Sequence, residues 1–148
     1  MSLQQIIDQD IKSAMLNKDS SRLRGLRAIK AALLVAKTEK GAETVTEEAG
    51  IRVLQRLVKQ RKESAEIYQA QNRQDLYQIE QEELQVIEAY LPKQMDRLEI
   101  SAHISAVIAR TGAAGMKDMG KVMGIVNKDL AGKADGKTIS ELVKELLT

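Results

Sequence analysis

Apolar side chains recur at intervals of three and four residues along the first part of the chain, which is the period of an amphipathic α-helix. The first stripe falls within residues 3–15. A second, longer stripe lies in LRGLRAIKAALLVAKTEK, residues 23–40, and Gly41 after it suits the end of a helix. Asp19 or Ser20 is the expected N-cap of the second helix, because a short side-chain oxygen accepts hydrogen bonds from unpaired backbone N–H groups there.

Two further apolar stripes predict two more long helices, within residues 47–70 and 76–91. Thr46 precedes two glutamates and is the expected N-cap of the third helix. The pattern breaks or kinks around residues 71–74. Pro92 should end the fourth helix, because proline lacks the N–H that an interior helical position donates.

Beyond residue 92 the apolar stripes become shorter and glycines become more frequent. Asp96 begins a capping-box pattern, which marks the start of a helix. Apolar positions within residues 100–108, 119–130 and 139–147 then predict three short helices. No segment of the chain gives a strand signal.

The composition agrees with helix packing. Aromatic residues make up 2% of the chain, with no Phe or Trp, so Leu, Ile, Val, Ala and Met must fill the core. We therefore predict an all-α protein in which residues 1–92 form an N-terminal bundle of about four long helices and residues 93–148 a small three-helix bundle. The second domain is small for independent stability, so we expect it to lean on the first domain or on a partner.

The chain has no cysteine, which excludes disulfides and thiolate metal sites. No apolar run reaches the roughly 20 residues of a membrane span. The N-terminal stretch MSLQQIIDQDIK does not have the pattern of a signal peptide. We therefore expect a cytoplasmic protein that makes no membrane contact.

The formal net charge is only +2, which does not by itself indicate nucleic-acid binding. The charges are nevertheless segregated along the chain. Bases outnumber acids within residues 18–40, residues 52–62 contain bases and no acid, and residues 74–90 contain acids and no base. Complementary, solvated helix faces are the expectation for such runs.

The stretch AGKADGKT, residues 131–138, contains two Gly-Lys pairs and a threonine, as some phosphate-binding loops do. A Walker A loop needs four residues between its glycines, whereas three separate Gly132 from Gly136. Ala131 occupies the place of the first glycine, and a helix rather than a strand is expected before it. We therefore expect no nucleotide site and no cofactor.

A connection between two helices explains the same stretch. Gly132 would end one helix, and Asp135 or Thr138 would cap the next. The turn also places Lys133 and Lys137 beside a helix N-terminus, where exposed N–H groups favour anions. The sequence leaves two roles open for this turn: a scaffold alone, or a contact with an RNA phosphate.

The segment MGKVMG places Gly120 and Gly124 four residues apart, on one face of a predicted helix. Close packing against another helix is the favoured explanation, because glycine is a poor helix former that is tolerated where backbones approach. An exposed face that an RNA backbone can approach is the alternative.

Residues for catalysis or metal binding are scarce. His103 is the only histidine and has no second histidine at a metal-binding spacing, so no metal site is expected. No nucleophile elbow is present, and no pair of carboxylates is marked as buried. Tyr68, Tyr77 and Tyr90 lie at helical positions and are too few for a base-stacking platform. We expect no catalytic residue in this chain.

Three segments together resemble the GatB/YqeY family. They are KQRKESAEIY at residues 59–68, LPKQM at residues 91–95 and DMGKVMGIVNKDLAGKADGKTISELVKELL at residues 118–147. Their order and spacing are similar to those of free-standing YqeY-like proteins over essentially the whole chain. The resemblance implies kinship with the helical tail of the B subunit of tRNA-dependent amidotransferase. That enzyme is a carbon–nitrogen ligase with glutamine as amido donor, and it converts misacylated Glu-tRNA(Gln) or Asp-tRNA(Asn) to the correct amide.

In the amidotransferase the tail is thought to help hold the tRNA, while other domains perform the chemistry. The resemblance therefore implies a binding function and an RNA-facing patch on one helix and one turn. Lys121, Lys133 and Lys137 would contact phosphates, and the glycines would permit close approach. The implied patch comprises Gly120, Lys121, Gly124, Gly132, Lys133, Asp135, Gly136 and Lys137.

The leading hypothesis is an accessory tRNA-binding helical protein that is not catalytic by itself. The competing hypothesis is a protein-interaction adaptor that docks on an aminoacyl-tRNA synthetase or an amidotransferase without touching RNA. An independent enzyme is the third hypothesis. Salt dependence separates the first two, because phosphate contacts weaken steeply with salt and apolar docking does not.

Overall fold

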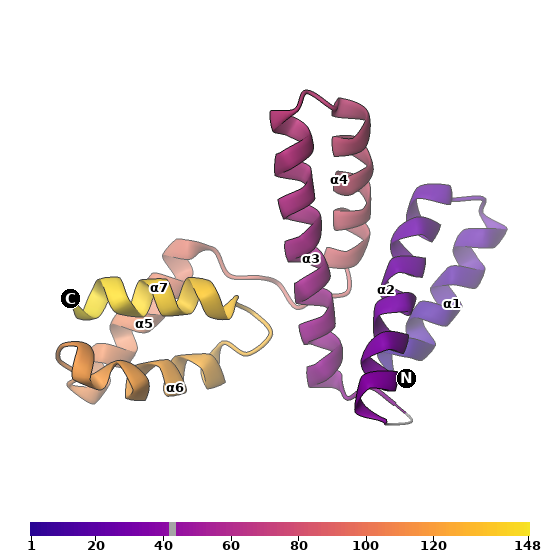
Figure 1. Ribbon diagram of the computed structural model, residues 1–148. Helices are drawn as coiled ribbons and strands as arrows, with labels where there is room; N and C mark the ends of the chain where they lie inside the picture. Colours follow the sequence, from indigo (N-terminus) through magenta and orange to yellow (C-terminus); the bar gives the residue numbers. More distant parts are fainter. Residues whose placement is uncertain (42–43) are drawn as a thin grey trace. The chain divides into compact units, whose positions relative to one another are not determined.

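The computed structural model describes residues 1–41 and 44–148. These residues form seven α-helices, one short 3₁₀ turn and no strand, which confirms the predicted all-α fold. They divide into two compact units, Met1–Leu91 (unit 1) and Pro92–Thr148 (unit 2) (Figure 1). The boundary expected from the sequence lies one residue later, and the expectation that the second part leans on the first or on a partner stays a prediction. No helix in the described part of the chain combines the length and the apolar character needed to cross a membrane.

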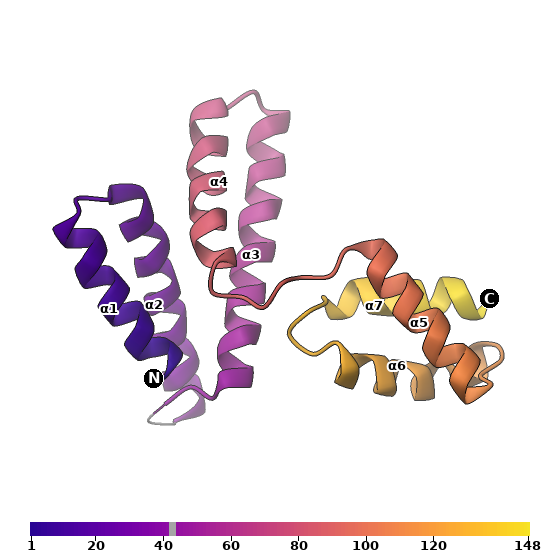
Figure 2. The same cartoon turned by 180° about the vertical axis from the view of Figure 1, so that it is seen from behind.

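Unit 1 consists of two antiparallel helix pairs. One pair is α1 (Leu3–Leu16) with α2 (Ser20–Lys40), and the other is α3 (Glu47–Ala70) with α4 (Gln74–Glu88). Both views show the helices of each pair side by side (Figures 1 and 2). Helix α2 contacts α1 on one side and α4 on the other, so it joins the two pairs.

Short polar side chains cap α2 and α3, as the sequence indicated. The Asp19 side chain accepts a hydrogen bond from the Arg22 backbone N–H at 3.2 Å, so Asp19 and not Ser20 is the N-cap of α2. Thr46 caps α3 in the same way. Gly41 ends α2 with φ +61°, a left-handed conformation that glycine adopts without strain.

The end of α4 differs from the prediction. The helix ends at Glu88, before Pro92 could interrupt it. Two tighter backbone bonds follow, from Tyr90 N–H to the Ile87 carbonyl and from Leu91 N–H to the Glu88 carbonyl. The chain has therefore already left the α-helix when it reaches Pro92.

The core of unit 1 lies where both helix pairs meet. The largest side chains there have no solvent exposure, and each contributes about 1.5–3 kcal/mol relative to an exposed position. They come from all four helices: Ile7, Leu26, Ile29, Leu54 and Ile87.

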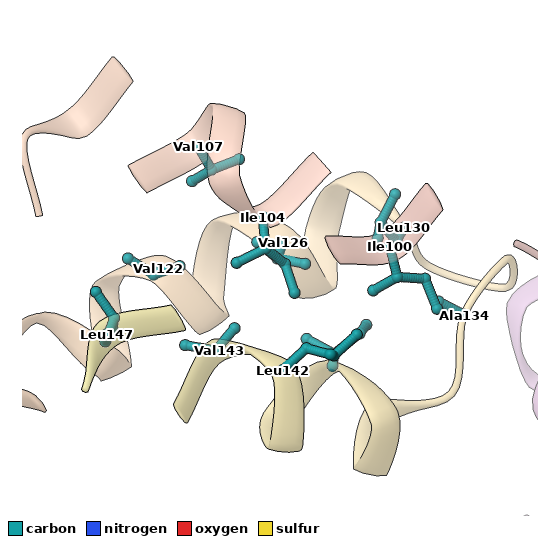
Figure 3. Packing of buried hydrophobic residues seen from close by; sticks show 11 residues of the cluster. Ile100, Ile104, Val107, Val122, Val126, Leu130, Ala134, Leu142, Val143 and Leu147 are labelled. Atoms are coloured by element: carbon teal, nitrogen blue, oxygen red, sulfur yellow. The ribbon is translucent and has the colours of Figure 1, made fainter. Parts of the chain in front are cut away.

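Unit 2 contains α5 (Arg97–Thr111), a 3₁₀ turn (Met116–Asp118), α6 (Met119–Asp129) and α7 (Gly136–Leu147). Each of the three helices packs against the other two. Their inward side chains form one aliphatic cluster, in which Ile104, Val126 and Val143 are fully buried (Figure 3). The cluster includes no aromatic ring, as the composition predicted.

Candidate nucleic-acid interface

The glycines of α6 do not serve helix packing. Gly120 and Gly124 are exposed, and a Cβ added at either position would meet no other part of the described chain within 4 Å. Glycine in a helix interior costs about 1 kcal/mol relative to alanine. The favoured explanation from the sequence, close packing against another helix, is therefore wrong. Helix α6 carries a bare outer face whose glycines the fold of unit 2 does not require.

Lysines flank this bare face. Lys121 follows Gly120 directly, and Lys128 lies four residues after Gly124, so helical geometry places these four residues on one side of α6. Both lysines are exposed. Lys128 was not among the predicted contact residues, although its spacing of seven residues from Lys121 marked it in the sequence. We call Gly120, Lys121, Gly124 and Lys128 the α6 face.

The turn between α6 and α7 has the glycine and the cap of an ordinary helix connection. Gly132 has φ +78°, which glycine tolerates, and Ala134 after it is buried in the core of unit 2. Asp135 is the N-cap of α7: its carboxylate accepts bonds from the Lys137 backbone N–H at 3.1 Å and from the Thr138 hydroxyl at 3.2 Å. Of the two predicted caps, Asp135 is the correct one.

The same cap limits what this turn can bind. The start of α7 already faces the negative charge of Asp135, so an incoming anion meets a carboxylate there rather than a free helix N-terminus. Asp135 is consequently unsuited to a phosphate contact. Lys133 and Lys137 remain exposed beside it, and Gly136 has open space around its Cα.

The segment LPKQM holds the turn from outside. The Gln94 side-chain amide donates to the Gly132 carbonyl at 2.7 Å and to the Pro92 carbonyl at 2.9 Å. The Met95 backbone N–H donates to the Lys133 carbonyl at 2.9 Å. Two segments that are far apart in sequence are thus hydrogen-bonded to one another, and the Gly132 and Lys133 carbonyls of the turn already have donors.

The predicted patch divides into two places. Lys121 lies near the start of α6, whereas Gly132 and Lys133 follow its end. At 1.5 Å per residue, Lys121 and Asp129 are already separated by about 12 Å along the helix axis. The predicted residues therefore lie on α6 and on the turn beyond its end, and Lys128 lies between them in the sequence.

Acidic side chains of unit 2 mostly have partners within the unit. Asp96 caps α5, and Asp118 accepts from the Ala114 backbone N–H at 2.8 Å. Asp129 pairs with His103 at 3.0 Å, which gives this histidine a structural partner. Around Arg97, two more carboxylates lie within 3.5 Å: Glu141 and Glu145.

Lysines of unit 2 behave in the opposite way. All of them are exposed, and none forms an ion pair with a residue that the structure describes. The cations of unit 2 are thus available to an external anion, while most of its carboxylates are held by internal contacts. The set is Lys93, Lys117, Lys121, Lys128, Lys133, Lys137 and Lys144.

In unit 1 the opposite charges meet between helices, as the charge runs indicated. Arg24 of α2 bonds Glu82 of α4 at 2.7 Å. Arg61 of α3 lies 2.9 Å from Glu83 and 3.7 Å from Glu80, both on α4. These pairs tie α4 to both of its neighbours. Burial raises the pKa of Glu80, and Arg61 opposes that rise only in part.

A pocket of about 330 Å³ lies between α2 and α4, a feature that the sequence did not indicate. Its polar lining is already engaged: Glu82 bonds Ser21 and Arg24, and Tyr90 bonds Asp10. Elsewhere in the described chain, no three His, Asp or Glu side chains come together as metal ligands. Among the described residues, neither the pocket nor a cluster of acidic side chains therefore provides groups with an evident chemical role.

Comparison with known proteins gives relatives that share most of this chain. A protein of Pyrenophora tritici-repentis is 27% identical over 95% of the chain and 78% of the relative. A protein of Meyerozyma guilliermondii is 32% identical over 95% of the chain and 74% of the relative. Both carry the name "Altered inheritance of mitochondria protein 41, mitochondrial".

These names contradict one prediction from the sequence. The absence of a recognisable signal led us to expect a cytoplasmic protein, whereas the relatives are named as mitochondrial. Absence of a signal pattern was a poor guide, because location is decided by addresses that are separate from the fold.

The family comparison covers nearly the whole chain. The model of the family described as Yqey-like protein matches residues 4–147, which include both units. The three segments that suggested the resemblance lie inside this match: residues 59–68, 91–95 and 118–147. The chain therefore belongs to the family of YqeY-like proteins.

Proposed function

We propose that this protein is an accessory RNA-binding protein, not catalytic by itself, whose unit 2 contacts the phosphate backbone of tRNA. The observation that carries the proposal is the α6 face: exposed glycines without a packing role stand beside the unpaired Lys121 and Lys128. A bare helix surface lets a nucleic-acid backbone come close, and lysine ammonium groups then reach its phosphates.

The chemistry of unit 2 favours backbone contact over base recognition. All tyrosines of the chain lie before Pro92, so unit 2 offers no Phe, Tyr or Trp ring on which an unstacked base could rest, and the imidazole of His103 pairs with Asp129. Lysine supplies point charges rather than the planar fork with which arginine recognises a guanine edge. The proposed ligand is therefore a folded RNA bound through its sugar–phosphate surface.

The choice of tRNA comes from the family resemblance. In the tRNA-dependent amidotransferase, the similar helical tail is thought to help hold tRNA, and the same role is proposed for this chain. An amidotransferase or an aminoacyl-tRNA synthetase is the proposed protein partner, because such an enzyme would supply the chemistry that this chain's residues do not suggest.

The test measures binding of labelled bulk tRNA to the wild type across a salt series. Two variants separate the two places of unit 2: Lys121→Ala with Lys128→Ala on the α6 face, and Lys133→Ala with Lys137→Ala at the turn. Each lost phosphate contact should lower the slope of log affinity against log salt by about 0.7–0.9. The α6 variant should show the larger loss, because Asp135 opposes anions at the turn.

The matched control removes the same charge elsewhere on unit 2, by Lys93→Ala with Lys144→Ala. Both lysines are exposed and unpaired with described residues, as the tested ones are. Equal losses of tRNA affinity in the control and in both variants would mean that only the net charge of the protein matters. That result would contradict a defined RNA-binding surface. No tRNA binding by the wild type at low salt would reject the proposal outright.

A second candidate function has one observation in its favour. The outer face of α5 carries no charge between Glu99 and Arg110, and Leu98 at its start is 82% exposed. Such a face suits docking on a protein, as an adaptor to a synthetase or an amidotransferase without RNA contact requires. Binding to the purified enzyme that is unaffected by salt and abolished by Leu98→Asp would favour this candidate.

A further inference from the structure

Helix α3 carries a line of basic side chains on the side opposite its core. Arg52, Arg56 and Lys59 follow at intervals of four and three residues, so they share one face of the helix. All three are exposed, whereas Leu54 and Leu57 between them are buried. At 1.5 Å per residue the line is about 10 Å long. We call these three residues the α3 basic stripe.

Glu48 and Glu63 lie at the two ends of this face, four residues from Arg52 and Lys59, but neither forms an ion pair with the stripe in the described part of the chain. Arg61 of α3 faces α4 and forms ion pairs with both Glu80 and Glu83. Arg24 of α2 forms an ion pair with Glu82 of α4. Consequently, none of the three residues of the stripe forms an ion pair within the described part of the chain.

The arrangement is unfavourable for the isolated helix. Arg52 and Arg56 are a like-charge pair four residues apart, and Lys59 adds a third positive charge on the next turn. Like charges at this spacing weaken a helix, whereas a face that only keeps a protein soluble commonly alternates charges of opposite sign. No acid occurs in the sequence from Arg52 to Lys62. The stripe is therefore concentrated positive charge that the fold of unit 1 does not use.

We infer that the α3 basic stripe is a second contact surface for the phosphate backbone of RNA, separate from unit 2. The inference rests on the proposed function for the identity of the ligand. Charge complementarity selects this occupant: three cations in a line fit a regularly spaced polyanion, and arginine guanidinium groups bond phosphates with two parallel N–H groups.

Other occupants fit the stripe less well. Stable protein partners bury apolar anchors at the centre of an interface, and no exposed large apolar side chain lies between Arg52 and Lys62. A membrane surface would need an apolar face beside the charges, and the exposed neighbour Gln60 is polar. An RNA held at both surfaces would gain affinity, because the second contact forms within a complex already made.

The experiment compares two triple variants of the full chain for binding of labelled tRNA over a salt series. The stripe variant is Arg52→Gln, Arg56→Gln, Lys59→Gln. We expect at least a tenfold weaker Kd at low salt and a salt slope lower by about two to three. Circular dichroism melting should show little change in stability, because all three positions are exposed.

The control variant removes the same charge from other exposed and unpaired positions of unit 1: Lys12→Gln, Lys18→Gln, Arg27→Gln. We expect its Kd to stay within about threefold of the wild type, since salt screens the general attraction of exposed charges that do not contact the RNA. Equal weakening in the stripe and control variants would overturn the inference.

Failure of the inference differs from failure of the proposed function. If the α6 variant loses tRNA and the stripe variant does not, the inference falls and the proposed function stands. If the stripe variant alone loses tRNA, unit 2 is not the RNA surface and the inference stands. Binding of the wild type to phosphatidylglycerol vesicles or to polyglutamate, lost in the stripe variant while tRNA binding is unchanged, would overturn the choice of RNA.

Discussion

Gly25 of α2 lies directly against Val86 of α4: a Cβ built on Gly25 would come within 2.7 Å of the Val86 Cβ. This is closer than two carbon atoms can approach without a shift of the backbone. The glycine therefore sets how near the two helix pairs of unit 1 come together, since α2 joins them.

The first prediction concerns this contact. Gly25→Ala should lower the free energy of unfolding by about 1–3 kcal/mol, because overpacking exceeds the gain in helix propensity. Urea denaturation followed by circular dichroism measures the change. An unchanged or raised midpoint would mean that the helices separate easily and that the contact does not constrain unit 1.

The matched substitution in unit 2 should act in the opposite direction. Gly124→Ala adds the same methyl group to an exposed helix position with open space around it, so stability should rise by up to about 1 kcal/mol. Affinity for tRNA should nevertheless fall, because the methyl group holds an RNA backbone away from α6. A stabilised protein with unchanged affinity would remove the glycines from the proposed interface.

The third prediction follows from the raised pKa of Glu80. A carboxyl group whose pKa is higher in the folded than in the unfolded state favours folding at low pH, and this contribution is lost as pH rises through the folded pKa. At neutral pH the buried charge is a cost. Glu80→Gln should therefore stabilise the protein at pH 7, and its advantage should shrink toward pH 4.

Melting temperatures at several pH values between 4 and 8 test this point. Glu88→Gln is the control, because Glu88 is exposed on the same helix and the substitution should have little effect on stability. A destabilising Glu80→Gln at pH 7 would show that the attraction to Arg61 outweighs burial of the charge.

The fourth prediction concerns the bonds that hold the α6–α7 turn. Gln94→Ala removes the donor to the Gly132 and Pro92 carbonyls, which should cost about 0.5–1.5 kcal/mol. Hydrogen exchange should show faster opening of the Met95 amide, which bonds the same turn. Unchanged protection of Met95 would mean that the backbone bond holds the turn without the side chain.

Much of the fold could be predicted because its signals are local. Asp19, Thr46 and Asp96 each accept a hydrogen bond from a backbone N–H three residues ahead, so the helix starts were recognisable from a short stretch of sequence. The period of the apolar residues predicted the helices themselves. The choice between Asp135 and Thr138 stayed open in the sequence, because both have short side-chain oxygens near the start of α7.

The sequence analysis wrongly favoured helix packing as the role of the α6 glycines, although the pattern of buried residues could have excluded it. The buried residues Val122 and Val126 define the inner side of α6, and the helical period places Gly120 and Gly124 on the outer side. The eight predicted contact residues lie on α6 and on the turn that follows it, and their action as one surface stays a prediction.

The tyrosines lie in unit 1 only, so their intrinsic fluorescence can be used to follow this unit. Tyr68 lies on α3, Tyr77 lies on α4, and Tyr90 follows α4, while unit 2 has no tyrosine and the chain has no tryptophan. Intrinsic fluorescence therefore reports on unit 1 alone, whereas far-ultraviolet circular dichroism reports on the helices of both units. Recording the two signals in one denaturation experiment distinguishes the unfolding of unit 1 from that of unit 2 without any added probe.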